Sequence, residues 1–138
     1  MNDVTNPVIA GIGLRQRASV QALQQVLSAA LAAAQQRGSA VSLAALASAA
    51  DKCQHPALLQ LAREWGLPLH AVALERLHMQ QARPSAQVPE RYGARSVAEA
   101  SALAVAGPGA VLACVRQVSA DGTATAAIAF PSSEHLMP

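Results

Sequence analysis

The sequence predicts an α/β fold with three layers, in which helices cover both faces of a central sheet. The sheet is expected to be mixed and mostly parallel, with about five strands and a C-terminal hairpin. Length supports this, because 138 residues fit one domain. Short apolar runs alternate with segments of helical spacing, which is the pattern of strand–helix–strand units. Hydrophobic residues make up 52% of the chain and charged residues 13%, so it can bury a core without disulfides or metal.

The first strand and helix are defined by clear start and stop signals. The apolar run Val8–Gly13 predicts a buried strand and a turn. Ser19 can cap the helix that follows, and Arg37 with Gly38 is a typical helix end. A second strand is expected at Val41–Ala49, because it lies between two helices.

A second helix and a third strand follow. Pro56 favours the first turn of this helix, and Gly66 is expected to end it. Leu69–Val72 predicts the third strand, and Ala73–Met79 a short helix after it. The buried stripe of the second helix is expected at Leu58, Leu59, Ala62 and Trp65.

The second half begins with a long loop or lid at residues 80–95, which is rich in Gln, Arg, Pro and Gly. Ser96–Ala106 predicts a helix that opens with a capping box. Ala110–Val115 and Ala124–Phe130 predict two strands, joined through the turn residues Asp121 and Gly122. We therefore expect a single domain over residues 1–138, with an ordered core at about 7–130 and a tail at 131–138.

Composition excludes several functional classes. Aromatic residues are only 2% of the chain, so base-stacking surfaces for single-stranded nucleic acid are not expected. A net charge of +2 is not a nucleic-acid signature. The apolar runs stop well before the roughly 18 residues of a membrane span, and the N-terminus lacks a signal-peptide pattern. Two cysteines form no disulfide framework. A cytoplasmic protein without nucleic-acid or membrane partners is the expectation.

Cations at the ends of predicted strands are the main candidate site. Gly11 and Gly13 form a tight turn after the first strand, where the backbone can approach an anion at the following helix. Position 16 is Gln16 rather than glycine, so a dinucleotide fingerprint is not supported. Arg15 follows the first strand and Lys52 the second. Because ligands of open α/β sheets bind at the carboxyl ends of strands, these two cations are expected to converge. A solvated surface cation is the alternative for each alone.

Other candidate residues lie in the second half. Arg95 in the loop and Arg116 near the end of the fourth strand could add cations. Ser96 and Glu99 form the capping box, and the same helix N-terminus could bind an anion. No metal site is expected, because Cys53-x-His55 matches no zinc spacing.

Four segments together resemble the CobE and CbiG C-terminal domain family of cobalamin biosynthesis. They are VIAGIGLRQRAS at Val8–Ser19, DKCQHPALLQLAREWGLPL at Asp51–Leu69, YGARSVAEASAL at Tyr92–Leu103 and TATAAIA at Thr123–Ala129. Their order and spacing make the resemblance specific over nearly the whole chain. With no preceding domain, the stand-alone CobE form is expected to be the closer relative.

The resemblance carries over site residues only where motifs match. The basic G-x-G-x-R segment is matched by Gly11, Gly13 and Arg15, and the family lysine by Lys52. The S-V-x-E-A element is matched at Ser96, Val97, Glu99 and Ala100. His55 replaces the acid of the family's acid-Pro pair, Asp51 stands one position after the expected acid, and Arg116 replaces a lysine. These departures weaken an acid–base role for the second loop and keep its cationic character.

The resemblance implies a part in cobalamin biosynthesis by the aerobic-type route. The implied ligand is a precorrin-type tetrapyrrole, a macrocycle with many carboxylate arms, which suits arginine and lysine. The chain would bind it as a carrier or auxiliary protein, without a cofactor, and other cobalamin-pathway enzymes are candidate partners. Two alternatives stay open. One is an enzyme that opens a lactone or releases a two-carbon fragment, with Glu99 as general base. The other is a small protein-interaction module.

Overall fold

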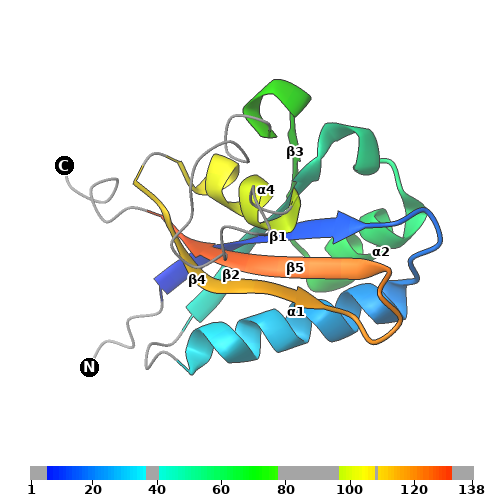
Figure 1. The fold of residues 1–138 in the computed structure, drawn as a ribbon, viewed down its shortest axis with the longest axis horizontal. Coiled ribbons are helices and arrows are strands. Elements are labelled where there is room, and N and C mark those ends of the chain that lie inside the picture. The colour runs from blue at the N-terminus through cyan, green and yellow to red at the C-terminus, as the bar shows by residue number, and fades with distance from the viewer. Residues whose placement is uncertain (1–5, 37–40, 78–96, 108, 132–138) are drawn as a thin grey trace, which may run out of the picture.

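The computed structural model describes residues 6–36, 41–77, 97–107 and 109–131. Within them, five strands form one sheet in the order β3-β2-β1-β5-β4 (Figure 1). The strands are β1 (Asn6–Leu14), β2 (Val41–Ala49), β3 (Leu69–Val72), β4 (Val111–Val118) and β5 (Ala124–Phe130). The helices are α1 (Val20–Gln35), the 3-10 turn η1 (Ala50–Lys52), α2 (Pro56–Trp65) and α4 (Val97–Ala106).

The direction of the strands confirms a mixed sheet. β1 pairs in parallel with β2, and β2 with β3. β5 runs antiparallel to both β1 and β4. Four strands therefore point one way and only β5 runs against them. As a result, the carboxyl ends of β1, β2 and β4 and the start of β5 meet at one edge of the sheet.

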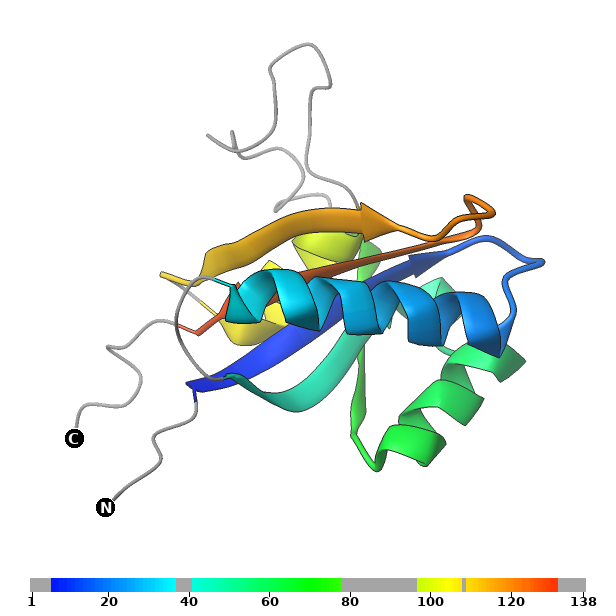
Figure 2. The ribbon, with the colours of Figure 1, turned by 90° about the horizontal axis from the view of Figure 1, so that it is seen from below.

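Two separate cores lie on the two faces of the sheet. Alternate residues of β1, such as Val8 and Ile12, pack with α1 and α2 on one face. Ile9 of β1 packs with β2 residues and α4 on the other face. Figure 1 shows α1 and α4 on opposite sides of the sheet, and Figure 2 shows α1 running along its face with α2 beside it. The predicted α/β class with three layers is therefore confirmed.

Gly11 explains how closely α4 approaches the sheet. A Cβ atom added at Gly11 would lie 1.9 Å from the carbonyl oxygen of Ala98 and 2.7 Å from the amide nitrogen of Ala102. Ala98 and Ala102 are one helical turn apart, and both are completely buried. The helix backbone thus rests directly on β1, and only glycine leaves room for it.

Most of the predicted helix starts and ends are found in the structure. The Ser19 side chain accepts a hydrogen bond from the Ala22 N–H (3.1 Å) and caps α1. Gly66 ends α2 in the left-handed region, with a φ of 65°. Residues Arg37 and Gly38 lie outside the described part of the chain. No helix among the described residues combines the length and apolar character that a membrane span requires.

Three expectations about local structure are wrong. Gly11 and Gly13 do not form a turn after the first strand, because both lie within β1 and pair with Ala127 and Thr125 of β5. The buried residues of α2 are Ala57, Leu58, Leu61 and Ala62, whereas Leu59 and Trp65 are 43% and 36% exposed. The face of α2 that packs against the core is therefore narrower than the apolar stripe in its sequence. β4 extends to Val118 rather than ending at Val115. A bulge between Cys114 and Gln117 lets the strand continue, because its extra residue restores the pairing with β5.

The turn between β4 and β5 is organised by Asp121. Its Oδ1 accepts hydrogen bonds from the hydroxyls of Ser119 and Thr123 (both 2.7 Å) and from the Thr123 N–H (3.0 Å). The bonds from Thr123 and then from Ser119 lower the pKa of the Asp121 carboxyl from 3.8 to about 2. Gly122 completes the turn with a φ of 76°.

This turn is expected to make stability depend on pH in the acid range. The folded pKa of Asp121 lies below its unfolded value, so its contribution is complete above pH 3.8 and is lost as the pH falls towards 2. Asp121→Asn should therefore be less stable than the unchanged protein at pH 7 and approach it in stability near pH 2. Urea unfolding between pH 2 and 7 measures this. A stability difference that does not change with pH would contradict the prediction.

Candidate functional site

A cleft of about 520 Å³ opens at the edge of the sheet where β1 and β2 end. Arg15, which follows β1, and Lys52, which ends η1, both line it. Its remaining described lining residues are Gly13, Leu14, Ala49, Asp51, Leu74, Leu77, Val97, Gly122, Thr123 and Thr125. The predicted convergence of Arg15 and Lys52 is thus a feature of the structure, and their role as ligand-binding residues stays a prediction.

Backbone hydrogen bonds fix the two chain segments from which the Arg15 and Lys52 side chains extend. The Arg15 N–H donates to the Thr123 carbonyl (2.8 Å), which joins the end of β1 to the β4–β5 turn. The Arg15 carbonyl accepts from the Ala18 N–H (3.0 Å) and closes a turn before α1. The Lys52 carbonyl accepts from the His55 N–H (3.0 Å). Each cation therefore extends from a short, hydrogen-bonded connection.

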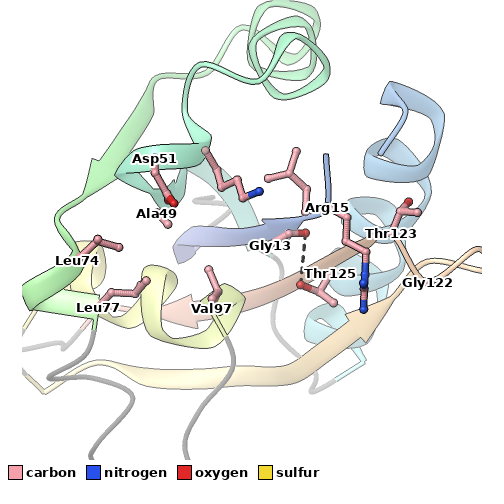
Figure 3. A pocket seen from close by; sticks show the side chains of 12 residues that line it. Gly13, Arg15, Ala49, Asp51, Leu74, Leu77, Val97, Gly122, Thr123 and Thr125 are labelled. Atoms are coloured by element: carbon pink, nitrogen blue, oxygen red, sulfur yellow. Dashed lines mark hydrogen bonds between the residues drawn. The ribbon is translucent and has the colours of Figure 1, made fainter. Parts of the chain in front are cut away.

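The cleft has an apolar side and a polar side. Figure 3 shows Leu74, Leu77 and Val97 on one side, and Arg15 with Gly122 and Thr123 on the other. Leu74 is 49% exposed, so it presents an apolar surface to a ligand. Between the adjacent strands β1 and β5, the Thr125 hydroxyl donates to the Gly13 carbonyl (3.4 Å). Such a cleft suits a ligand with an apolar body and anionic groups at its rim.

The apolar side is built from segments far apart in the sequence. Leu74 and Leu77 lie in a helical turn at residues 74–77, after β3. Arg76 in this turn donates from Nη2 to the Ala104 carbonyl (2.6 Å), which joins the turn to α4. Val97 begins α4. No motif signalled Leu74 or Leu77, and Val97 was named only as part of the family's S-V-x-E-A element. Only the packing of the turn against α4 brings the three side chains together.

The other predicted site residues are distributed as follows. Gly13 lines the cleft, whereas Gly11 lies beneath α4 and is not among the described lining residues. Arg116 lies exposed on the edge strand β4 and is likewise not among them. Arg95 and Ser96 lie outside the described residues, as does the predicted loop at residues 80–95. The described cationic site thus consists of Arg15 and Lys52, with the Asp51 carboxylate beside them.

Glu99 is buried in the protein and holds two elements together. It is 1% exposed and lies in the first turn of α4. Its Oε2 accepts a hydrogen bond from the Arg116 N–H (3.3 Å), at the bulge of β4. The positive end of the helix dipole also stabilises a carboxylate at this position. Glu99 is not among the described lining residues of the cleft, so these contacts favour a structural role over the predicted role of general base.

Replacing Glu99 with glutamine tests that role. The amide keeps the shape of the side chain but removes a charge that the helix dipole stabilises, so we expect the free energy of unfolding to fall by about 1–2 kcal/mol. Binding of ligand in the cleft should not change. Urea unfolding and ligand titration of Glu99→Gln measure the two effects. A large loss of ligand conversion without loss of stability would instead support the catalytic role.

Cys53 does not have the features of a reactive or metal-binding thiol. Its Sγ lies 3.5 Å from the Ala49 carbonyl oxygen, to which it can donate. Burial, and then the negative charge of Asp51, raise the pKa of the Cys53 thiol. Among the described residues, no group of three or more His, Cys, Asp and Glu side chains could hold a metal ion. The side chain of Cys114 lies outside the described part of the structure.

Comparison with known proteins identifies the family. A family model described as the C-terminus of cobalamin synthesis protein G matches residues 8–129. The chain belongs to this CbiG C-terminal family. The resemblance that the sequence motifs indicate is therefore confirmed, and so is a place among the proteins of cobalamin biosynthesis. No curated protein matches the chain.

Two crystal structures resemble this CbiG C-terminal domain over most of its length. One is CobE, a protein from the cobalamin (vitamin B12) biosynthetic pathway, with 33% identity over 94% of each chain and a TM-score of 0.72. The other is the cobalamin biosynthesis protein chiG from Agrobacterium tumefaciens, with 36% identity over 91% of this chain and 98% of that chain, and a TM-score of 0.65.

Proposed function

We propose that the cleft binds a precorrin-type tetrapyrrole, a polycarboxylate corrin precursor, and that the protein acts as a carrier or auxiliary protein in cobalamin biosynthesis. One observation carries the proposal: Arg15 and Lys52, from different strand ends, line one cleft whose other side is apolar. An apolar ring edge fits against Leu74, Leu77 and Val97. Carboxylate arms at the rim of the ring reach the two cations.

The dimensions and chemistry of the cleft support this assignment. Its volume of about 520 Å³ lies within the usual range of small-molecule sites. Arginine binds carboxylates through two parallel hydrogen bonds, and lysine adds a point charge. The Asp51 carboxylate disfavours a further anion next to Lys52, so the position of each carboxylate arm is restricted. Similarity to CobE over 94% of both chains supports a part in the cobalamin (vitamin B12) biosynthetic pathway.

A visible-absorbance titration with precorrin and hydrogenobyrinic-type compounds tests the proposal. We expect tight binding that weakens as salt rises, because exposed charges are screened. Mass spectrometry of the recovered ligand should show no change in mass. An amidated corrinoid, in which the carboxylates are neutral amides, serves as the matched control and should bind much more weakly.

Three other outcomes of the titration would each contradict a part of the proposal. Equal binding of the amidated control would contradict recognition through carboxylates. Conversion of the ligand to a new mass would contradict the carrier role and support a lactone-opening or fragment-releasing enzyme. No binding to any of the compounds would contradict the proposal and favour a protein-interaction module.

A further inference from the structure

The His55 side chain connects the two loops that carry the cations of the cleft. Its Nε2 lies 2.8 Å from the carbonyl oxygen of Gln16, the residue after Arg15. Its Nδ1 accepts a hydrogen bond from the Ala57 N–H (3.1 Å), which caps the start of α2. A backbone N–H can only donate, so Nδ1 carries no proton and Nε2–H donates to Gln16. Both ring nitrogens are therefore used, and the tautomer is determined.

The backbone of His55 extends this connection to the second cation. Its N–H donates to the Lys52 carbonyl (3.0 Å). Hydrogen bonds therefore run from Lys52 through His55 to Gln16, next to Arg15. His55 is half-buried and is not among the described lining residues of the cleft. It can thus influence a ligand only through the positions of its neighbours.

We infer that His55 is a positioning residue that holds Arg15 and Lys52 at a set separation for two carboxylates of one macrocyclic ligand. The inference rests on the proposed function and adds to it. Carboxylates on a macrocycle have limited freedom of spacing, so cations held in advance at the matching distance lose less entropy on binding. Without the His55–Gln16 hydrogen bond, the β1–α1 connection and the start of α2 could move apart.

His55→Asn separates this function from helix capping. Asparagine is a good N-cap and can accept from the Ala57 N–H, but its side chain is too short to reach Gln16. Gln24→Ala is the matched control. It removes a different hydrogen bond, which joins α1 to α2 from Gln24 Nε2 to Glu64 Oε1 (2.5 Å), and neither residue lines the cleft.

We expect His55→Asn to weaken binding of hydrogenobyrinic acid about tenfold, while Gln24→Ala leaves it within about twofold. Coupling between the cations gives a sharper readout. In the unchanged protein, Arg15→Ala and Lys52→Ala together should weaken binding less than the product of their separate effects, because one ligand engages both cations. In the His55→Asn background, the loss of affinity caused by both substitutions together should equal the product of their separate losses. A loss of stability alone would not remove this coupling.

Two results would overturn the inference. One is binding and coupling in His55→Asn equal to those of the unchanged protein, which would leave the proposed function intact. The other is a ¹⁵N NMR spectrum in which His55 of the unchanged protein carries its proton on Nδ1. Absence of hydrogenobyrinic acid binding by the unchanged protein would instead overturn the proposed function and the inference with it. If His55→Asn does not fold, His55→Ser replaces it, since serine is also a good N-cap.

Discussion

Replacing Gly11 with alanine is expected to lower the free energy of unfolding by about 3 kcal/mol or more. The new methyl group would lie 1.9 Å from the Ala98 carbonyl oxygen, a backbone atom of α4. No side-chain rotation can relieve this contact, so the whole helix must move away from the sheet. α4 is buried along nearly its entire length, and its displacement would disturb one of the two cores.

The effect arises from space rather than from backbone conformation. Gly11 is not among the described glycines with positive φ. Where the backbone allows alanine, the substitution usually stabilises a protein by about 0.4–1 kcal/mol through the unfolded state. A loss of stability in Gly11→Ala therefore measures the steric contact directly. Urea unfolding of the purified variant provides the value, and a midpoint equal to that of the unchanged protein would contradict the observed packing.

Gly13→Ala is the matched control on the same strand. Its added Cβ would lie 2.6 Å from the Thr125 Oγ1, which belongs to a side chain and can rotate away. We expect a loss of only about 1 kcal/mol. The double variant Gly13→Ala with Thr125→Ala should recover part of this loss, whereas no change of Thr125 should improve Gly11→Ala.

Reversing both cations of the cleft is expected to weaken binding of free-carboxylate corrinoids about 100-fold. Arg15→Glu together with Lys52→Glu removes two charge-assisted contacts and places carboxylates against the carboxylate arms of the ligand. Neither cation is buried in the core, and no fall in stability large enough to unfold the protein is expected. Visible-absorbance titration measures the affinity, and urea unfolding checks the fold.

The matched control for each single reversal is Arg63→Glu. Arg63 lies exposed near the end of α2 and does not line the cleft. The Arg63→Glu variant changes the net charge of the protein by the same amount as Arg15→Glu or Lys52→Glu does. Weaker binding in Arg63→Glu to the same extent would mean that overall charge, rather than this cleft, attracts the ligand. Unchanged binding in the double reversal would exclude the cleft as the site.

Part of the site could be predicted from the sequence. Parallel strands place their carboxyl ends at one edge of a sheet, so cations directly after β1 and β2 had to lie near each other. Arg15 and Lys52 therefore share a cleft, although 16 residues of α1 stand between the two strands. The apolar side could not be predicted, because Leu74 and Val97 are neighbours only through packing. His55 was noted in the sequence as a departure from the family pattern, but its hydrogen bond to Gln16 joins two separate connections and has no local signal.

Gly11, Gly13 and Glu99 show that the sequence alone could not decide the role of a residue whose surroundings come from distant parts of the chain. Gly11 and Gly13 were expected to form a tight turn after the first strand, either as a plain turn or as an approach to an anion, but both lie within β1. The two glycines have different surroundings, because Gly11 lies beneath α4 and Gly13 lines the cleft. Glu99 in a capping box was likewise expected either to cap or to catalyse, and its burial against the β4 bulge depends on a strand that follows it.

The sequence by itself determined the fold class, the strands and helices, the N-cap at Ser19, the end of α2 at Gly66 and the edge of the sheet where cations gather. These features depend on hydrophobic periodicity and on residues a few positions apart, which the sequence displays directly. Only the tertiary structure decided which face of α2 is buried, how far β4 extends, what lies over Gly11 and Glu99, and which apolar side chains complete the cleft. Each of these depends on contacts between residues far apart in the chain, and their energies arise only when the layers pack.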